Sequence, residues 1–129
     1  MRHMLARCVL LLALCSLVPA APPATAASAK RVIVHFFTVP VTLPDGTPAK
    51  ARLAELETWL TETCGGYTKL GQAVGGWKNE AGQTESETNI AYLVSSPRDV
   101  SAALAARLHK DFGERVPYVL TFPAGRFFP

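Results

Sequence analysis

The chain has 129 residues, 49% of them hydrophobic, and its 13 basic and 10 acidic side chains give a formal net charge of +3. This length suits a single small domain, and no internal repeat is evident. Nucleic-acid-binding proteins usually show a patch or stripe of Lys and Arg. Because no segment of this chain clusters basic residues in that way, we expect no nucleic-acid partner.

Residues 1–27 have the organisation of a secretory signal peptide. Arg2 and Arg7 make a basic start, residues 8–18 are almost entirely apolar, and small residues around Ala26 suit a signal peptidase. A membrane helix needs about 20 apolar residues. The shorter run here predicts cleavage, with no stable membrane anchor afterwards, and therefore an exported protein that is periplasmic or secreted.

Residues 28–129 then form one mature domain with nearly balanced charge. Loss of the two leader arginines leaves eleven basic against ten acidic residues, a formal net charge of +1. Two of the three cysteines also belong to the leader, so Cys64 cannot form an internal disulfide. We expect its thiol to be a small buried group at the end of a helix. An intermolecular disulfide or a reactive thiol is the alternative.

The first predicted element is a strand over Arg31–Val39 with two apolar sides, which is typical of a central strand. A turn-rich connection follows, in which Thr47 is expected to cap a helix and Pro48 to occupy its first position. Apolar residues then recur at helical spacing until Gly65-Gly66 permits a left-handed cap. The recurring helix positions are Leu53, Leu56, Leu60 and Thr63, with Trp59 beside them.

Two strands and a hairpin turn are predicted next. Gln72–Lys78 is glycine-rich and reads as a weak or bulged edge strand. Asn79–Gln83 forms the turn, and Glu87–Val94 is the partner strand. The second helix is expected to start at Ser96–Asp99, which places a cap, a proline at the first turn and a carboxylate three residues on. It ends at Gly113, and a last strand covers 116–122.

The element order strand, helix, strand, strand, helix, strand predicts an α+β fold of the ferredoxin-like βαββαβ type. Such a sandwich has a four-stranded antiparallel sheet with two helices on one face. We assign Val32, Val34 and Phe36, with Ile90, Tyr92 and Val94, to the helix-covered face because that register contains no charge. The open face would then carry Ile33, His35, Phe37, Val39, Glu87, Asn89, Ala91 and Leu93.

This open face is too apolar to meet water comfortably. Exposed apolar patches of several hundred Å² normally mark interaction sites. We therefore predict a homodimer in which two such faces pack together. The C-terminal Phe127–Pro129 could add to that contact or cover a sheet edge.

The middle third of the chain contains a series of motifs: Gly65-Gly66-Tyr67-Thr68, Gly75-Gly76-Trp77, a Gly82 turn, and an acidic strand start with Glu85 and Glu87. In these motifs the chain resembles small uncharacterised bacterial exported proteins of presumed ferredoxin-like fold. More broadly, the element order is similar to the dimeric αβ-barrel proteins, which include cofactor-independent monooxygenases, haem-handling enzymes and small-molecule sensors. The resemblance implies a fold and no particular activity.

Candidate chemistry centres on His35, whose imidazole could act as a general base near neutral pH. Glu87 or Asn89 on the neighbouring strand could orient its ring. The alternative is a histidine hydrogen-bonded within a dimer interface, with Glu87 beginning a strand in solvent.

Three aromatic residues are candidate contacts for a small-molecule ligand. Trp77 and Tyr67 flank glycines, which leave space that a flat ligand could occupy, and Phe37 shares the predicted open face with His35. The alternative is that these rings are packing anchors. We predict no metal site and no cofactor, since His35, His109 and Cys64 lie on different elements without the convergent spacing of metal ligands.

Two functional hypotheses follow. The first is an exported binding or interaction module that dimerises through its open sheet face. The second is a cofactor-independent enzyme of the αβ-barrel type, with His35 as base and Trp77 lining a pocket for an aromatic or quinone-like molecule.

Overall fold

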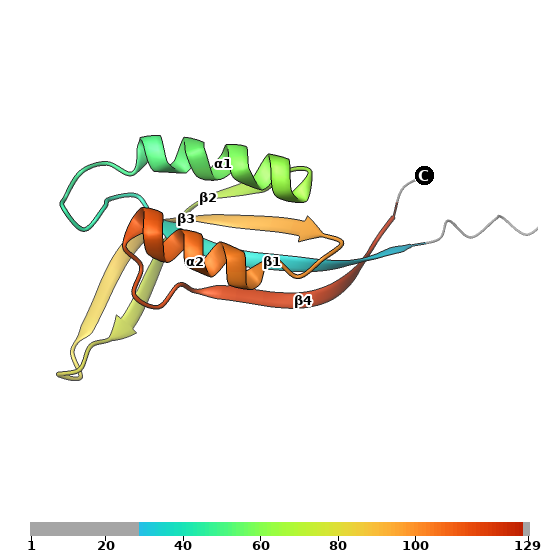
Figure 1. The fold of residues 1–129 in the computed structure, drawn as a ribbon. Coiled ribbons are helices and arrows are strands. Elements are labelled where there is room, and N and C mark those ends of the chain that lie inside the picture. The colour runs from blue at the N-terminus through green and yellow to red at the C-terminus, as the bar shows by residue number, and fades with distance from the viewer. Residues whose placement is uncertain (1–28, 128–129) are drawn as a thin grey trace, which may run out of the picture.

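The computed structural model describes residues 29–127, and Figure 1 shows their arrangement. The predicted signal peptide and the last two residues lie outside that range, so the prediction for 1–27 stays a prediction. In chain order the elements are β1 (Lys30–Pro40), α1 (Lys50–Cys64), β2 (Thr68–Lys78), β3 (Thr84–Ser96), α2 (Ser101–Phe112) and β4 (Val119–Arg126).

The ferredoxin-like fold is confirmed. All neighbouring strands run antiparallel in a single sheet of order β2-β3-β1-β4, with β1 and β3 at the centre. Both helices cover one face of this sheet, and the opposite face has no helix over it (Figure 1). Among the described residues, no helix is long and apolar enough to cross a membrane.

The expected sidedness of β1 is wrong. His35, Phe37 and Val39, expected on the open face, point into the helix layer, where Phe37 and Val39 are fully buried. The register shows why, because Phe37 lies opposite Tyr92 and His35 lies opposite Val94, and directly paired residues of an antiparallel sheet share a face. Val34 and Phe36 accordingly lie on the open face.

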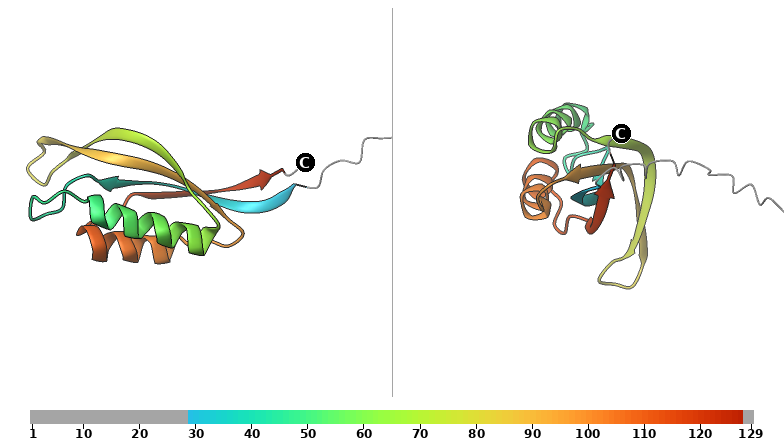
Figure 2. Two further views of the ribbon diagram at one scale, coloured as in Figure 1. Left: turned by 90° about the horizontal axis from the view of Figure 1, so that it is seen from above. Right: turned by 90° about the vertical axis from the view of Figure 1, so that its right-hand side faces the viewer.

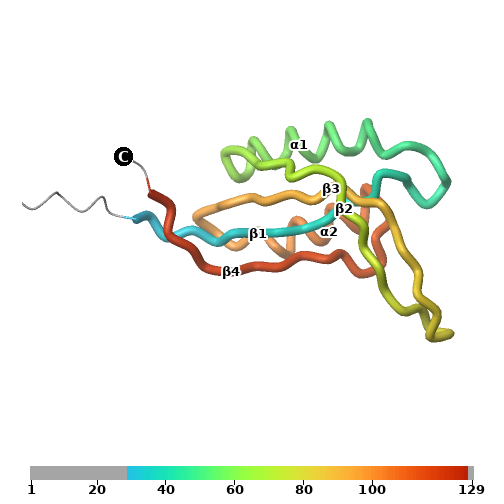
Figure 3. The backbone as a smooth tube through the Cα atoms, turned by 180° about the vertical axis from the view of Figure 1, so that it is seen from behind, coloured from blue at the N-terminus to red at the C-terminus, as the bar shows by residue number. Residues whose placement is uncertain are grey.

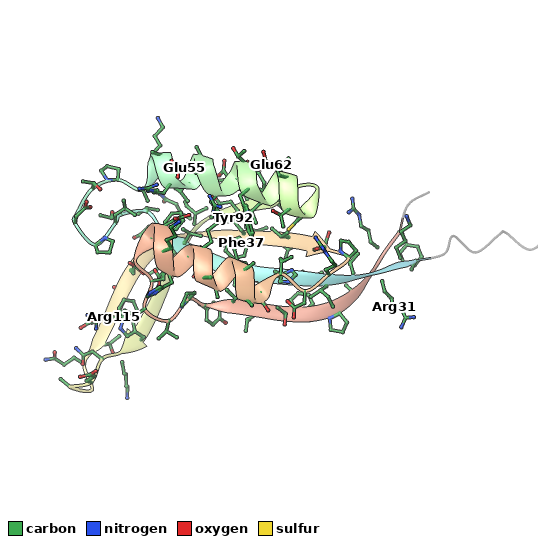
Figure 4. The ribbon with its side chains drawn as sticks, in the orientation of Figure 1. Arg31, Phe37, Glu55, Glu62, Tyr92 and Arg115 are labelled. Atoms are coloured by element: carbon green, nitrogen blue, oxygen red, sulfur yellow. The ribbon has the colours of Figure 1, made fainter. Side chains whose placement is uncertain are left out.

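Sequence could not decide this point because both sides of β1 are apolar. The structure places the larger Phe37 ring in the core, where it stacks on Tyr92 with ring centroids 5.4 Å apart and an interplanar angle of 10°. Figure 4 shows these two side chains between the sheet and α1. The assignment of Ile90, Tyr92 and Val94 to the helix side agrees with their place in the core.

The helix starts differ from expectation, whereas the helix ends agree. Helix α2 begins at Ser101 after Val100, so Ser96 is not its cap and Pro97 lies before its first turn. Thr47 does not cap α1; its N–H and hydroxyl both donate to the carboxylate of Asp45, at 2.9 and 2.6 Å. The helix follows Ala49 instead. Both helices end at a glycine in the left-handed region, Gly65 at φ 82° and Gly113 at φ 73°.

The β2–β3 hairpin extends well beyond the rest of the sheet. Strand β2 begins at Thr68, earlier than the predicted Gln72, and it carries a bulge between Lys69 and Gly71. Figure 2 shows the far half of the hairpin curving away from the helix layer, and Figure 3 shows it swinging past the start of β4. Strand β4 starts at Val119, later than the predicted 116, and reaches Arg126.

Candidate functional site

His35 lies inside the subunit, between the sheet and the start of α2. Its side chain is fully buried, and its Nε2 accepts a hydrogen bond from the Val100 N–H at 3.1 Å. An Nε2 that accepts in this way carries no proton, so the geometry assigns the proton to Nδ1. Within residues 29–127, Nδ1 has no hydrogen-bond partner.

Asp99 is the acidic neighbour of this histidine. Its Oδ1 lies 3.2 Å from Nε2 of His35 and accepts a hydrogen bond from the Ser101 N–H at 2.8 Å. The hydrogen bonds from Ser101 are the main reason that the pKa of Asp99 lies below its usual value. Asp99 thus stays ionised and holds the first turn of α2, while the neutral imidazole satisfies an N–H that the helix itself leaves free.

The structure does not bring His35 together with Glu87 or Asn89. Asn89 pairs with Pro40, whereas His35 pairs with Val94. Asn89 is five positions before Val94 on β3, which is about 16 Å along the strand. An odd number of positions places Asn89 and the partner of His35 on opposite faces of the sheet. The Asn89 Nδ2 donates to the Glu87 carbonyl at 3.4 Å instead. A catalytic role for these three residues remains a prediction that the arrangement does not favour.

The three predicted ligand contacts also lie apart. Phe37 is enclosed in the core. The Tyr67 hydroxyl donates to Oε2 of Glu57 at 2.9 Å, at the edge of α1. Trp77 is 46% exposed on the far half of the hairpin, paired with Glu85. Their binding of a shared ligand therefore stays a prediction without a common pocket.

Glu57 organises a polar cluster that sequence reasoning missed. Its carboxylate accepts hydrogen bonds from the hydroxyls of Tyr67 and Tyr92 and from the Lys69 ammonium, at 2.9, 2.7 and 2.9 Å. Partial burial pushes the pKa of Glu57 up, but the bonds from these donors outweigh it, so the pKa lies below its usual value. Burial, followed by the bond to this carboxylate, strongly raises the pKa of Tyr92.

This cluster ties α1 to the edge of the sheet. The donors are 10, 12 and 35 residues from Glu57 in sequence, so no local pattern could have announced it. The ionised carboxylate meets three donors and is fully engaged, which indicates a structural role.

Cys64 agrees with the expectation of a small buried group. It is the last residue of α1, it is 8% exposed, and burial raises the pKa of its thiol. In the described part of the chain, no three His, Cys, Asp or Glu side chains gather in a way that could hold a metal ion.

On the open face of the sheet, large apolar side chains at and just before β4 are partly exposed, next to the edge where β4 pairs with β1. Tyr118, Leu120 and Phe122 are 54%, 46% and 46% exposed. Phe36 pairs with Leu120 and contacts the Tyr118 ring edge-on, with centroids 6.3 Å apart. We call Phe36, Leu93, Tyr118, Leu120 and Phe122 the open-face patch. Strand pairing places Phe36, Leu93, Leu120 and Phe122 on the side opposite the helices, and Tyr118 joins them through its ring contact with Phe36.

An apolar open face is therefore present, although its members on β1 are not those predicted. Val34 pairs with Phe122 on one side and Ser95 on the other, and it is buried beneath the patch, with 9% of its surface exposed. This surface is the best-supported candidate functional site of the described residues.

Comparison with known proteins adds support for the fold. No family model and no curated protein matches the chain. Among solved structures, it is similar to CutA1 from Oryza sativa, with 18% identity, a TM-score of 0.54, and coverage of 74% of this chain and 82% of that one. It is also similar to the divalent ion tolerance protein CutA1 from Ehrlichia chaffeensis, with 14% identity, a TM-score of 0.52, and coverage of 72% and 80%.

A Bacillus cereus protein related to NIF3 matches over a smaller share of its own length. It is 12% identical with a TM-score of 0.54, and the match covers 74% of this chain but 26% of that chain. At these identities the likenesses show a shared α+β fold, a four-stranded antiparallel sheet under two helices, as in CutA1 proteins.

Proposed function

We propose that this protein is a small exported interaction module that associates with a second copy of itself through the open-face patch. The observation that carries the proposal is the partial exposure of Tyr118, Leu120 and Phe122 on a sheet face without helices. Such a face is costly to leave in water.

The energetic argument rests on the area still exposed. Fully burying a large apolar side chain contributes about 1.5–3 kcal/mol. Leu120 and Phe122 keep nearly half of their surface exposed, so each would contribute roughly 1 kcal/mol on association. Phe36 and Leu93 beside them would extend the dry area. A patch of this kind suits weak to moderate association, since association also costs translational and side-chain entropy.

The geometry gives less support to an αβ-barrel enzyme acting on an aromatic or quinone-like molecule. A base must reach the proton that it abstracts, and His35 is enclosed with its Nε2 occupied by the Val100 N–H. One of the similar structures is named a divalent ion tolerance protein. Within residues 29–127, however, no three potential metal ligands gather. The interaction module is therefore the function that we propose.

Self-association is tested on residues 28–129 by light scattering across a concentration series. We expect twice the monomer mass for the unchanged chain and a monomer for Leu120→Asp, which places a charge in the patch. Val74→Asp is the matched control, because Val74 is 76% exposed and pairs with Thr88 on the other side of the sheet. A monomer at every concentration, or equal effects of both variants, would overturn the proposal.

Export is tested separately by expressing residues 1–129 in a bacterium and sequencing the N-terminus of the product. Cleavage within Ala24–Ala27 would leave a chain that starts at Ala27 or Ser28 outside the cytoplasm. Recovery of the intact chain from the cytoplasm would contradict this part of the proposal.

A further inference from the structure

The two ends of the sheet carry opposite charge. At one end, β1 and β4 run on past the helices as a two-stranded arm, where Lys30 pairs with Arg126 and Arg31 follows (Figure 1). Arg98, in the connection between β3 and α2, lies at the same end. Figure 4 shows Arg31 near the tip of this arm. We call Lys30, Arg31 and Arg126 the basic arm.

The opposite end, the far half of the β2–β3 hairpin, is acidic. Glu80, Glu85 and Glu87 outnumber Lys78 there. Glu114, which follows α2, also lies close to this hairpin. Burial raises the pKa of Glu114, and the nearby charge of Glu87 raises it further. Arg115 is a second cation near the same end, besides Lys78 (Figure 4). We call residues 77–87 the acidic hairpin.

Lys30 and its partner Arg126 at one end, and Glu85 and Glu87 at the other, lie on the side of the open-face patch, whereas Arg31 points to the opposite side. Lys30 is two residues before Val32 and four before Val34, so it shares the open side of β1. Glu85 pairs with Trp77 and is eight residues from Leu93, which places it on the same side of β3. The patch therefore lies between a basic end and an acidic end, with the ten steps of β1 alone spanning about 33 Å.

We infer that two copies pack their open faces in opposite directions, so that the basic arm of each meets the acidic hairpin of the other. This inference rests on the proposed function and names its partner and orientation. In a two-fold interface each contact is made twice. Packing in the same direction would instead place basic arm on basic arm and acidic hairpin on acidic hairpin, and such like-charge contacts select against that arrangement.

Trp77 gains a role in this arrangement. It is 46% exposed, and it stands beside Glu85 in the acidic hairpin. The approach of a Lys or Arg of the partner's basic arm would place a cation over an indole face, which is a favourable contact. In this arrangement Trp77 is a contact site for the basic arm of the second copy.

Charge reversal tests the orientation. In oppositely directed packing, Lys30→Glu and Glu85→Lys each turn two attractive contacts into repulsive ones. Each variant should weaken the dimer by roughly tenfold at low salt. The double variant restores the charge pairing and should recover most of the affinity. Lys50→Glu, on the exposed first turn of α1, is the matched control and should leave the dimer unchanged.

The dependence of dimer affinity on salt concentration is an independent test of the charge pairing. Screening shortens electrostatic reach from about 10 Å at 0.1 M to about 3 Å at 1 M salt. High salt should therefore weaken the unchanged dimer and abolish the difference between it and the reversal variants.

The outcomes separate this inference from the proposed function. If Leu120→Asp dissociates the dimer but neither charge reversal matters, or the double variant is no better than the singles, the orientation is wrong and the proposed function stands. A mass of three or more subunits would also overturn the two-fold packing. If the unchanged chain is monomeric, both fall together.

Discussion

The Glu57 cluster makes the most quantitative prediction. Replacing Glu57 by Gln preserves the shape of the side chain but removes its charge and its capacity to accept from three donors. Hydrogen bonds to charged groups contribute about 1.5–3 kcal/mol each when buried. Here the Lys69 side chain is 43% exposed, and exposed ion pairs contribute little. The Tyr92 donor is fully buried, so its bond dominates.

We therefore expect Glu57→Gln to lower the free energy of unfolding by about 1–2 kcal/mol. Glu57→Ala should cost more, about 2–3 kcal/mol, because the buried Tyr92 hydroxyl then loses its acceptor altogether. Tyr92→Phe removes that hydroxyl and should largely abolish the difference between the Gln and Ala variants. Glu62→Gln is the matched control, since Glu62 is an exposed carboxylate on the same helix (Figure 4).

The same carboxylate should confer acid sensitivity. The folded pKa of Glu57 lies below the ordinary value of 4.5, so the unfolded chain binds its proton more readily. The stabilisation is then complete above the ordinary pKa and is lost as the pH falls through the folded pKa. The gap in stability between the unchanged chain and Glu57→Gln should narrow steadily below pH 4.5.

Urea unfolding followed by circular dichroism measures these quantities. All variants should be compared in the Leu120→Asp background, because association would add a concentration-dependent term to the stability. Equal unfolding midpoints for Glu57→Gln and Glu62→Gln, or a gap that widens in acid, would refute the reasoning.

Three further predictions concern the helix ends and the cysteine. Gly113→Ala should destabilise the fold by about 1–2 kcal/mol in urea unfolding, because Gly113 has φ 73° and an added Cβ would come within 2.5 Å of Pro44; an unchanged midpoint would show that this loop yields freely. His35→Leu removes the acceptor of the Val100 N–H, so hydrogen exchange of that amide should accelerate while His35→Gln retains part of its protection; equal exchange in both would contradict the bond. Cys64, with its pKa raised by burial, should react with iodoacetamide much more slowly in the folded than in the urea-unfolded chain, and equal rates would disprove its burial.

The amino-acid sequence by itself determined the element order and hence the fold. The helical spacing of Leu56 and Leu60 and the glycines that follow the C-terminal ends of both helices are local features. Each can be recognised within a single segment of the sequence. It also indicated that one sheet face would remain apolar, because both sides of β1 are apolar and the βαββαβ fold places both helices on the same face.

Tertiary structure alone decided which side of β1 faces the helices. Both sides of that strand are apolar, so periodicity could not distinguish them, and a shift of one residue exchanges every side chain between faces. The stacking of Phe37 on Tyr92 and the bond between His35 and Val100 joined distant segments and settled the choice. The Glu57 cluster likewise exists only once remote residues meet, which no local pattern encodes.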